Sequence, residues 1–112
     1  MDHRPSFESI AIITTTVGEE ADANRLAQAA VQAGLAACVQ TESMSSHYIW
    51  QGQLECSGEW RLVLKTVPAV VPDLLEWLQA QHPYDVPQLL VRTEQANPAY
   101  AAWVAAQVKI KK

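Results

Sequence analysis

The amino-acid sequence predicts an α+β fold in which strands and helices follow the order β-α-β-β-α-β, form an antiparallel sheet and end with a C-terminal helix. Three observations lead to this prediction. Apolar, β-branched runs alternate with segments of helical periodicity, and two long strand-like runs are joined by only two residues. The chain has 112 residues, which fits a single domain over residues 1–112.

The first strand and the first helix are expected in the N-terminal third of the chain. Residues 7–14 are mostly β-branched and apolar, which is typical of a buried strand. The sequence TVGE at residues 16–19 has the S/T-x-x-E form of a capping box and predicts a helix that begins there. Alanine and leucine then recur at helical spacing, and Gly34 stands where a left-handed helix C-cap belongs.

A long β-hairpin is expected next. Residues 36–50 and 53–66 favour strands, and Gln51 and Gly52 between them predict a two-residue turn, because glycine tolerates positive φ. Each arm of about 14 residues spans roughly 45 Å, whereas a compact chain of this size has a radius of gyration near ~13 Å. The hairpin should therefore extend beyond its own domain.

An extended hairpin leaves backbone edge groups unpaired and leaves apolar side chains such as Tyr48, Ile49 and Trp50 without cover from their own chain. Pairing with another chain removes both problems, so we expect the hairpin to form an oligomer interface. An alternative is a bulge near Gly58 that folds the hairpin back onto its own sheet.

The C-terminal half is expected to complete the sheet and to add two helices. Apolar residues at helical spacing predict a helix over residues 68–81, and residues 82–87 predict a rigid, proline-containing loop. Residues 88–94 favour a last strand, and an Asn-Pro pair predicts the start of a closing helix over residues 97–108. The order is that of the ferredoxin-like fold, which packs two helices on one face of an antiparallel sheet.

Composition and charge disfavour several classes of protein. Eight Lys and Arg against twelve Asp and Glu give a net charge of -4, and nucleic-acid binding depends on neutralising phosphates. The apolar run at residues 10–13 is too short to span a bilayer, and the N-terminus carries charges in place of an apolar signal core. We therefore expect no nucleic acid, no membrane contact and a cytoplasmic protein whose two cysteines stay reduced.

The charged residues of the hairpin do not indicate an enzyme. No G-x-S-x-G sequence is present, and the segment after the first strand lacks the base that a phosphatase needs for its anion. Glu55, Glu59 and Lys65 could line a cleft between subunits, or they could form salt bridges or solvated charges at an interface.

The two-residue turn also predicts which residues face each other across the hairpin. It places His47 opposite Cys56, and an imidazole with a thiolate would suit copper or zinc. Two ligands are too few for a tight site in one chain, and the pair could equally be an ordinary surface contact. Cys38 falls opposite Lys65 and far from Cys56, so no intramolecular disulfide is expected.

Several uncommon residues occur together along nearly the whole chain, in an order that resembles the CutA divalent-cation-tolerance family. They are Gly34-Leu35-Ala36-Ala37-Cys38-Val39, Tyr48-x-Trp50-x-Gly52 with Glu55 and Glu59, Lys65-Thr66, His82-Pro83-Tyr84-x-x-Pro87, and Asn97-x-x-Tyr100-x-x-Trp103. The resemblance implies a ferredoxin-like protomer, a homotrimer held by strand pairing between subunits, and a fold related to PII-type signalling proteins. It also implies a response to divalent metal ions, copper above all, and no established reaction.

The resemblance implies a metal site that this sequence retains only in part. Copper binding in the family draws on a cysteine near the end of the first strand and on a histidine pair, and here those positions hold Thr14 and Gln81-His82. Of these family positions only His82 keeps a candidate ligand for copper or another divalent cation, although it could instead cap the preceding helix. Gln88 replaces a glutamate that the family usually has after the loop proline.

Two hypotheses for function follow. The first is a metal-responsive trimer that binds copper or another divalent cation. The second is a PII-like scaffold that binds a small molecule or a protein in clefts between subunits, without a metal of its own. The candidate cleft residues are Tyr48, Trp50, Glu59, Lys65, Tyr84 and Gln88.

Overall fold

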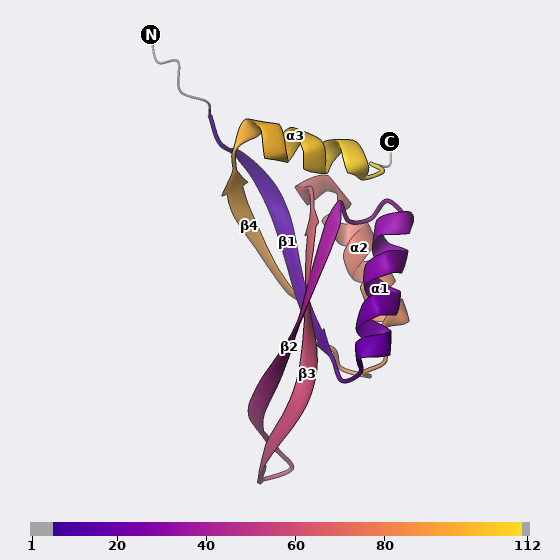
Figure 1. Cartoon of the computed structure of the whole chain (residues 1–112), viewed down its shortest axis with the longest axis vertical. Coiled ribbons are helices and arrows are strands. Elements are labelled where there is room, and N and C mark those ends of the chain that lie inside the picture. The colour runs from indigo at the N-terminus through magenta and orange to yellow at the C-terminus, as the bar shows by residue number, and fades with distance from the viewer. Residues whose placement is uncertain (1–5, 111–112) are drawn as a thin grey trace.

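The computed structural model describes residues 6–110, which form one four-stranded antiparallel sheet and three α-helices. The strands lie in the order β2-β3-β1-β4. Helices α1 and α2 lie beside one another, and α3 lies across the opposite end of the body from the hairpin tip (Figure 1). The elements are β1 (Glu8–Val17), α1 (Glu20–Gln32), β2 (Cys38–Trp50), β3 (Gln53–Thr66), a 3-10 turn (Pro68–Val70), α2 (Val71–Gln81), β4 (Leu90–Ala96) and α3 (Pro98–Gln107).

The alternation of side chains along β1 divides the core between the two faces of the sheet. Ile13 and Val17 point toward α1 and α2 and pack with the buried leucines of β3 and of both helices. Ile10 and Ile12 point to the other face and pack against α3, where Val104 is fully buried. The strand therefore reads as a continuous apolar run because both of its faces are covered, as the sequence predicted.

The predicted capping box at the start of α1 is wrong. Thr16 is the penultimate residue of β1, where it pairs with Arg61 of β3, and its side chain is not a helix cap. The N-cap of α1 is Glu19, which has extended dihedral angles and no side-chain capping bond. The strand runs to Val17 rather than ending at Thr14 because its last residues continue the ladder with β3.

The two predicted turns at glycine are confirmed. Gly34 follows α1 with φ of 72°, and Gln51 and Gly52 both have positive φ, as a two-residue hairpin turn requires. Thirteen residue pairs then continue without interruption from Trp50–Gln53 to Cys38–Lys65. The alternative of a bulge near Gly58 is therefore wrong, since Gly58 stands in register opposite Ser45.

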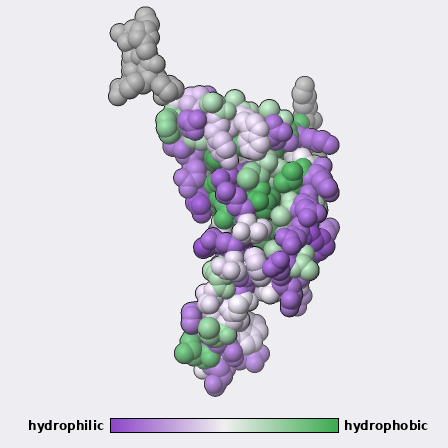
Figure 2. All heavy atoms as spheres, in the orientation of Figure 1, coloured by the Kyte–Doolittle hydropathy of each residue, from purple (hydrophilic) through white to green (hydrophobic). Residues whose placement is uncertain are grey.

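The distal half of the β2–β3 hairpin extends beyond the body. The neighbouring strand β1 pairs with β3 only from Trp60 to Thr66, so the sixteen-residue segment 44–59 has no further strand beside it within the described chain. Apolar residues gather at its tip (Figure 2), where Ile49 is 67% exposed and Leu54 is 75% exposed. The described chain measures 59 × 29 × 20 Å, and the predicted extension is confirmed.

The C-terminal half follows the prediction with shifted boundaries. The helix predicted over residues 68–81 begins as a 3-10 turn at Pro68 and becomes α-helical at Val71. The last strand begins at Leu90, where it first pairs with Thr14, two residues later than predicted. The loop needs these residues to pass from the end of α2 to the outer edge of β1, and Pro87 has no N–H for the ladder.

Candidate functional site

A groove of about 1070 Å³ lies where the distal hairpin meets the loop after α2. Five of the six residues predicted for a cleft line it: Tyr48, Trp50, Glu59, Tyr84 and Gln88. The strand alternation explains this grouping for the hairpin, because Tyr48, Trp50 and Glu59 point to the same face of the ribbon. Tyr84 and Gln88 arrive from the loop, which sequence reasoning could associate with the hairpin only through the family resemblance.

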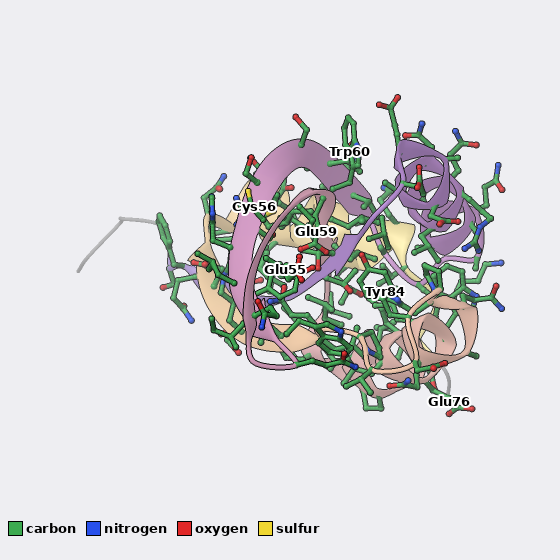
Figure 3. The ribbon with its side chains drawn as sticks, turned by 90° about the horizontal axis from the view of Figure 1, so that it is seen from below. Glu55, Cys56, Glu59, Trp60, Glu76 and Tyr84 are labelled. Carbon is green, nitrogen blue, oxygen red and sulfur yellow. The ribbon has the colours of Figure 1, made fainter. Side chains whose placement is uncertain are left out.

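Glu59 and Tyr84 connect the hairpin to the loop. The Tyr84 hydroxyl donates a hydrogen bond to Oε2 of Glu59 over 3.1 Å. In Figure 3, Glu55 and Glu59 lie on the inner side of the hairpin toward Tyr84, whereas Cys56 and Trp60 lie on the other side. Burial, followed by the hydrogen bond to Glu59, raises the pKa of Tyr84 to about 12, so this hydroxyl stays a neutral donor at physiological pH.

The space beside Tyr84 depends on a glycine at the end of β1. A Cβ atom at Gly18 would lie 3.2 Å from the Tyr84 oxygen, which is tighter than nine in ten such contacts, so the hydroxyl would have to shift by a few tenths of an ångström. The hydroxyl can therefore pass beneath the end of β1 to reach Glu59. Gly18 belongs to the predicted capping box, and nothing in the sequence alone indicates its contact with Tyr84.

Lys65 is not part of this groove. It lines a second cavity of about 540 Å³ on the face of the sheet that α3 covers, where its Nζ lies 5.6 Å from the centre of the Tyr100 ring. Lys65 and Glu59 point to the same face of β3, but six residues of extended strand separate them by roughly 20 Å. Within one chain the two residues therefore share a face of β3 and line different cavities.

His82 is buried at the end of α2, with only 9% of its surface exposed. Its Nδ1 accepts a hydrogen bond from the backbone N–H of Tyr84 over 3.1 Å. The proton of the neutral ring therefore belongs on Nε2, which donates to Oγ1 of Thr15 over 2.9 Å. Burial lowers the pKa of His82 below its ordinary value of 6.5, which favours this neutral form.

The geometry of one protomer does not fit a metal ion at His82. Both ring nitrogens are engaged within the chain, and no cluster of three or more His, Cys, Asp or Glu side chains suited to a metal occurs among the described residues. The predicted cross-strand pair does form, with Nε2 of His47 3.8 Å from Sγ of Cys56. These are two donors on an exposed part of the hairpin, and both cysteines are free thiols.

Comparison with known proteins identifies the family. Residues 11–107 match the family described as CutA1 divalent ion tolerance protein. This chain belongs to the CutA1 family. The resemblance noted in the sequence is thereby confirmed, and the family is named for tolerance to divalent cations.

Individual CutA proteins are similar to this chain over most of its length. The divalent-cation tolerance protein CutA of Pectobacterium atrosepticum is 34% identical over 97% of this chain and 100% of its own length. Protein CutA of the mouse, Mus musculus, is 36% identical over 86% of this chain, which spans only 55% of that longer relative.

Solved CutA structures have the same fold. CutA from Synechococcus elongatus is 39% identical and superimposes with a TM-score of 0.89 over 93% of this chain and 94% of its own. A second structure of that protein, complexed with a Bis-Tris molecule, gives 38% identity and a TM-score of 0.84 over 92% and 97% of the two chains. The ferredoxin-like, PII-like architecture expected from the sequence is therefore confirmed. In the described part of this chain, every helix is too short or too polar to cross a membrane.

Proposed function

We propose that this CutA1-family chain is a homotrimeric, non-enzymatic binding protein that acts in the response to divalent metal ions. The observation that carries the proposal is the groove between the hairpin and the loop, which collects aromatic, carboxylate and amide side chains at one place. The family's name supports the link to divalent cations. A cytoplasmic location is part of the proposal and agrees with the free thiols of Cys38 and Cys56.

The hairpin supports the oligomeric part of the proposal. Its tip exposes Ile49, Trp50 and Leu54, three large apolar side chains that a second subunit can cover. The radius of gyration of the described chain, 15.9 Å, exceeds the value of about 13 Å expected for a compact domain of this size. The number of three subunits comes from the family resemblance.

Sedimentation velocity at micromolar concentration tests the assembly. We expect a single species of about three times the chain mass of 12.4 kDa. A species of the mass of one chain, unchanged on concentration, would remove the physical basis of the proposal. A stable dimer would keep the hairpin interface and reject the number three.

The geometry favours an organic ligand in the groove over a metal ion at His82, which lies outside the lining of the groove. His82, the metal ligand that the family resemblance implied, already uses both ring nitrogens, so metal binding there must break its hydrogen bond to Thr15 or to Tyr84. CutA from Synechococcus elongatus, of the same fold, was solved in complex with Bis-Tris, an organic molecule. Copper binding through His82 therefore remains a separate prediction within the proposed function.

Calorimetric titration of copper(II) into the assembled protein tests that prediction. His82→Ala and Cys56→Ser are the matched variants, because they remove the buried imidazole and the exposed thiol of the His47–Cys56 pair, respectively. Saturable binding that only His82→Ala abolishes would establish His82 as a ligand. Binding that only Cys56→Ser abolishes would place the metal site at the His47–Cys56 pair of the hairpin. If neither the wild type nor the variants bind copper, binding of an organic ligand is left as the function of the groove.

A further inference from the structure

The groove between the hairpin and the loop carries negative charge and aromatic rings. Among the described residues that line it, Glu59 and Asp85 are the charged ones, and no lysine or arginine is present. The rings of Tyr48, Trp50 and Tyr84 line the same space. Carboxylates and aromatic faces both attract cations, and the chain as a whole has a net charge of -4.

The nearest positive charges on the same face of β3 are neutralised or distant. Arg61 stands two residues from Glu59, but its Nε donates to Oε1 of Glu42 over 2.8 Å. Lys65 stands six residues from Glu59 and lies over the ring of Tyr100 in the other cavity. Glu55 points to the same face as Glu59 and adds a further negative charge beside the groove. An anion entering this groove therefore meets uncompensated carboxylates.

Glu59 is held in place and retains capacity to bind a ligand. Tyr84 donates to one carboxylate oxygen, Oε2, and the structure gives Glu59 no other hydrogen-bond partner within the described residues. An ionised carboxylate has about four acceptor sites, so most of them remain free for a ligand. The Tyr48 hydroxyl of β2 lies 3.3 Å from Oγ of Ser57 on β3. This contact holds the ring of Tyr48, a second aromatic group of the groove, in place.

We propose that this groove selects a small organic ammonium cation that carries a hydroxyl group. Glu59 pairs with the positive charge, the rings of Tyr48 and Trp50 contact the methylene or methyl groups attached to nitrogen, and the polar lining bonds the hydroxyl. The hydroxyl partners are Thr16, Ser45, Ser46, Ser57 and Gln88. The inference rests on the proposed function of the groove as a ligand site and names the charge and class of that ligand.

Three probes of nearly the same shape and different charge test the proposal. Choline is a hydroxylated quaternary ammonium ion, 3,3-dimethylbutan-1-ol replaces its nitrogen by carbon and is neutral, and 3,3-dimethylbutanoate carries a negative charge. Each is titrated into the assembled protein by calorimetry at pH 7.5, with low and high salt compared. We expect choline to bind about tenfold or more tightly than the alcohol, the anion to bind least, and choline affinity to fall as salt rises.

Two variants with the same chemical change locate the site. Glu59→Gln removes the groove carboxylate and is expected to weaken choline about tenfold without changing the affinity for the alcohol. Glu76→Gln removes an exposed carboxylate on α2 that points away from the groove (Figure 3), and it is expected to change nothing.

The outcomes separate this inference from the proposed function. Equal binding of choline and the alcohol, or a preference for the anion, would overturn the charge selectivity while leaving an organic ligand in the groove. If Glu59→Gln and Glu76→Gln weaken choline binding equally, the effect comes from the net charge of the protein and not from the groove. That result would also overturn the proposal. Failure of all three probes to bind the intact oligomer would count against the groove as a ligand site altogether.

Discussion

The two halves of the β2–β3 hairpin have the same backbone and opposite surroundings. Both halves belong to one ladder of thirteen pairs. In the half near the body, Leu62 and Leu64 are fully buried beneath α1 and α2. In the distal half, Leu54 is 75% exposed and Ile49 is 67% exposed. The same residue type on the same strand is thus core in one half and surface in the other.

The two halves of the hairpin are stabilised by different contacts. The near half is stabilised by its own helices, because burial of a leucine contributes about 1.5–3 kcal/mol. Among the described residues, the distal half has its hairpin ladder, the cross-strand contacts of Tyr48 with Ser57 and of His47 with Cys56, and the contact between Glu59 and Tyr84. An isolated two-stranded hairpin is marginal in water. The proposed second subunit would cover the distal half, and the groove lies where the two halves meet.

The largest effect is expected from truncating the near half. Leu62→Ala should lower the free energy of unfolding by about 2–5 kcal/mol, because it leaves a cavity under two helices. Urea denaturation measures this value. The control Leu54→Ala removes the same atoms from the exposed tip and should change protomer stability by less than about 0.5 kcal/mol at concentrations where the chains are separate. Equal losses in the two variants would abolish the distinction between the halves.

The next effect concerns the assembly rather than the fold. Leu54→Asp places a charge in the apolar tip and should weaken subunit association at least about 30-fold, the equivalent of roughly 2 kcal/mol at an interface hot spot. Sedimentation equilibrium measures the association, and circular dichroism shows whether the protomer stays folded. A fully assembled Leu54→Asp protein would mean that the tip is not covered by another subunit.

The sequence predicted the strands and helices well where periodicity and turn chemistry agree. The Gln51–Gly52 turn set the register of the whole hairpin, including the approach of His47 to Cys56. The prediction from the sequence was wrong at the start of α1, where a local capping motif competes with the pairing of two strands. Thr16 fits a capping box, but its backbone completes the ladder with β3. A local pattern cannot reveal a partner strand some 45 residues away in the chain.

The candidate site was predictable in its hairpin residues and less so elsewhere. Side-chain alternation places Glu59 and Tyr48 on one face of the hairpin. It does not show where the loop after α2 meets that face, and so it did not indicate that Lys65 lines a different cavity. The two hydrogen bonds of His82 were not predictable, because Thr15 is 67 residues away and only the folded sheet brings it near. A histidine before a proline looks the same in sequence whether its ring is free or engaged.

A smaller effect is expected at the contact that joins the distal half to the body. Tyr84→Phe removes the hydrogen bond to Glu59 and should lower stability by at most about 1 kcal/mol at pH 8, because the site is partly exposed. The pKa of Tyr84 is raised to about 12, so the stabilising contribution is complete below pH 10 and is lost as the pH rises through 12.

Ultraviolet titration of the phenolates checks this assignment. The wild type should show a tyrosine that ionises near pH 12, which Tyr84→Phe removes and Glu59→Gln shifts downward. Tyr100→Phe is the control, since its ring stacks on Trp103 away from the groove. If a tyrosine still ionises near pH 12 in Tyr84→Phe, the contact between Tyr84 and Glu59 is not the cause of that ionisation.

The smallest effect tests how the loop is held on the body. Burial lowers the pKa of His82, so the folded state favours the neutral ring, and its contribution to stability is complete above about pH 6.5 and declines as the pH falls. His82→Gln should flatten this part of the urea-denaturation profile between pH 7.5 and 5. His47→Gln, at an exposed imidazole of the distal hairpin, should leave the profile unchanged. If His47→Gln flattened the profile instead, the acid sensitivity would belong to the hairpin. The neutral ring between Thr15 and Tyr84 would then not be what fixes the loop against the end of β1.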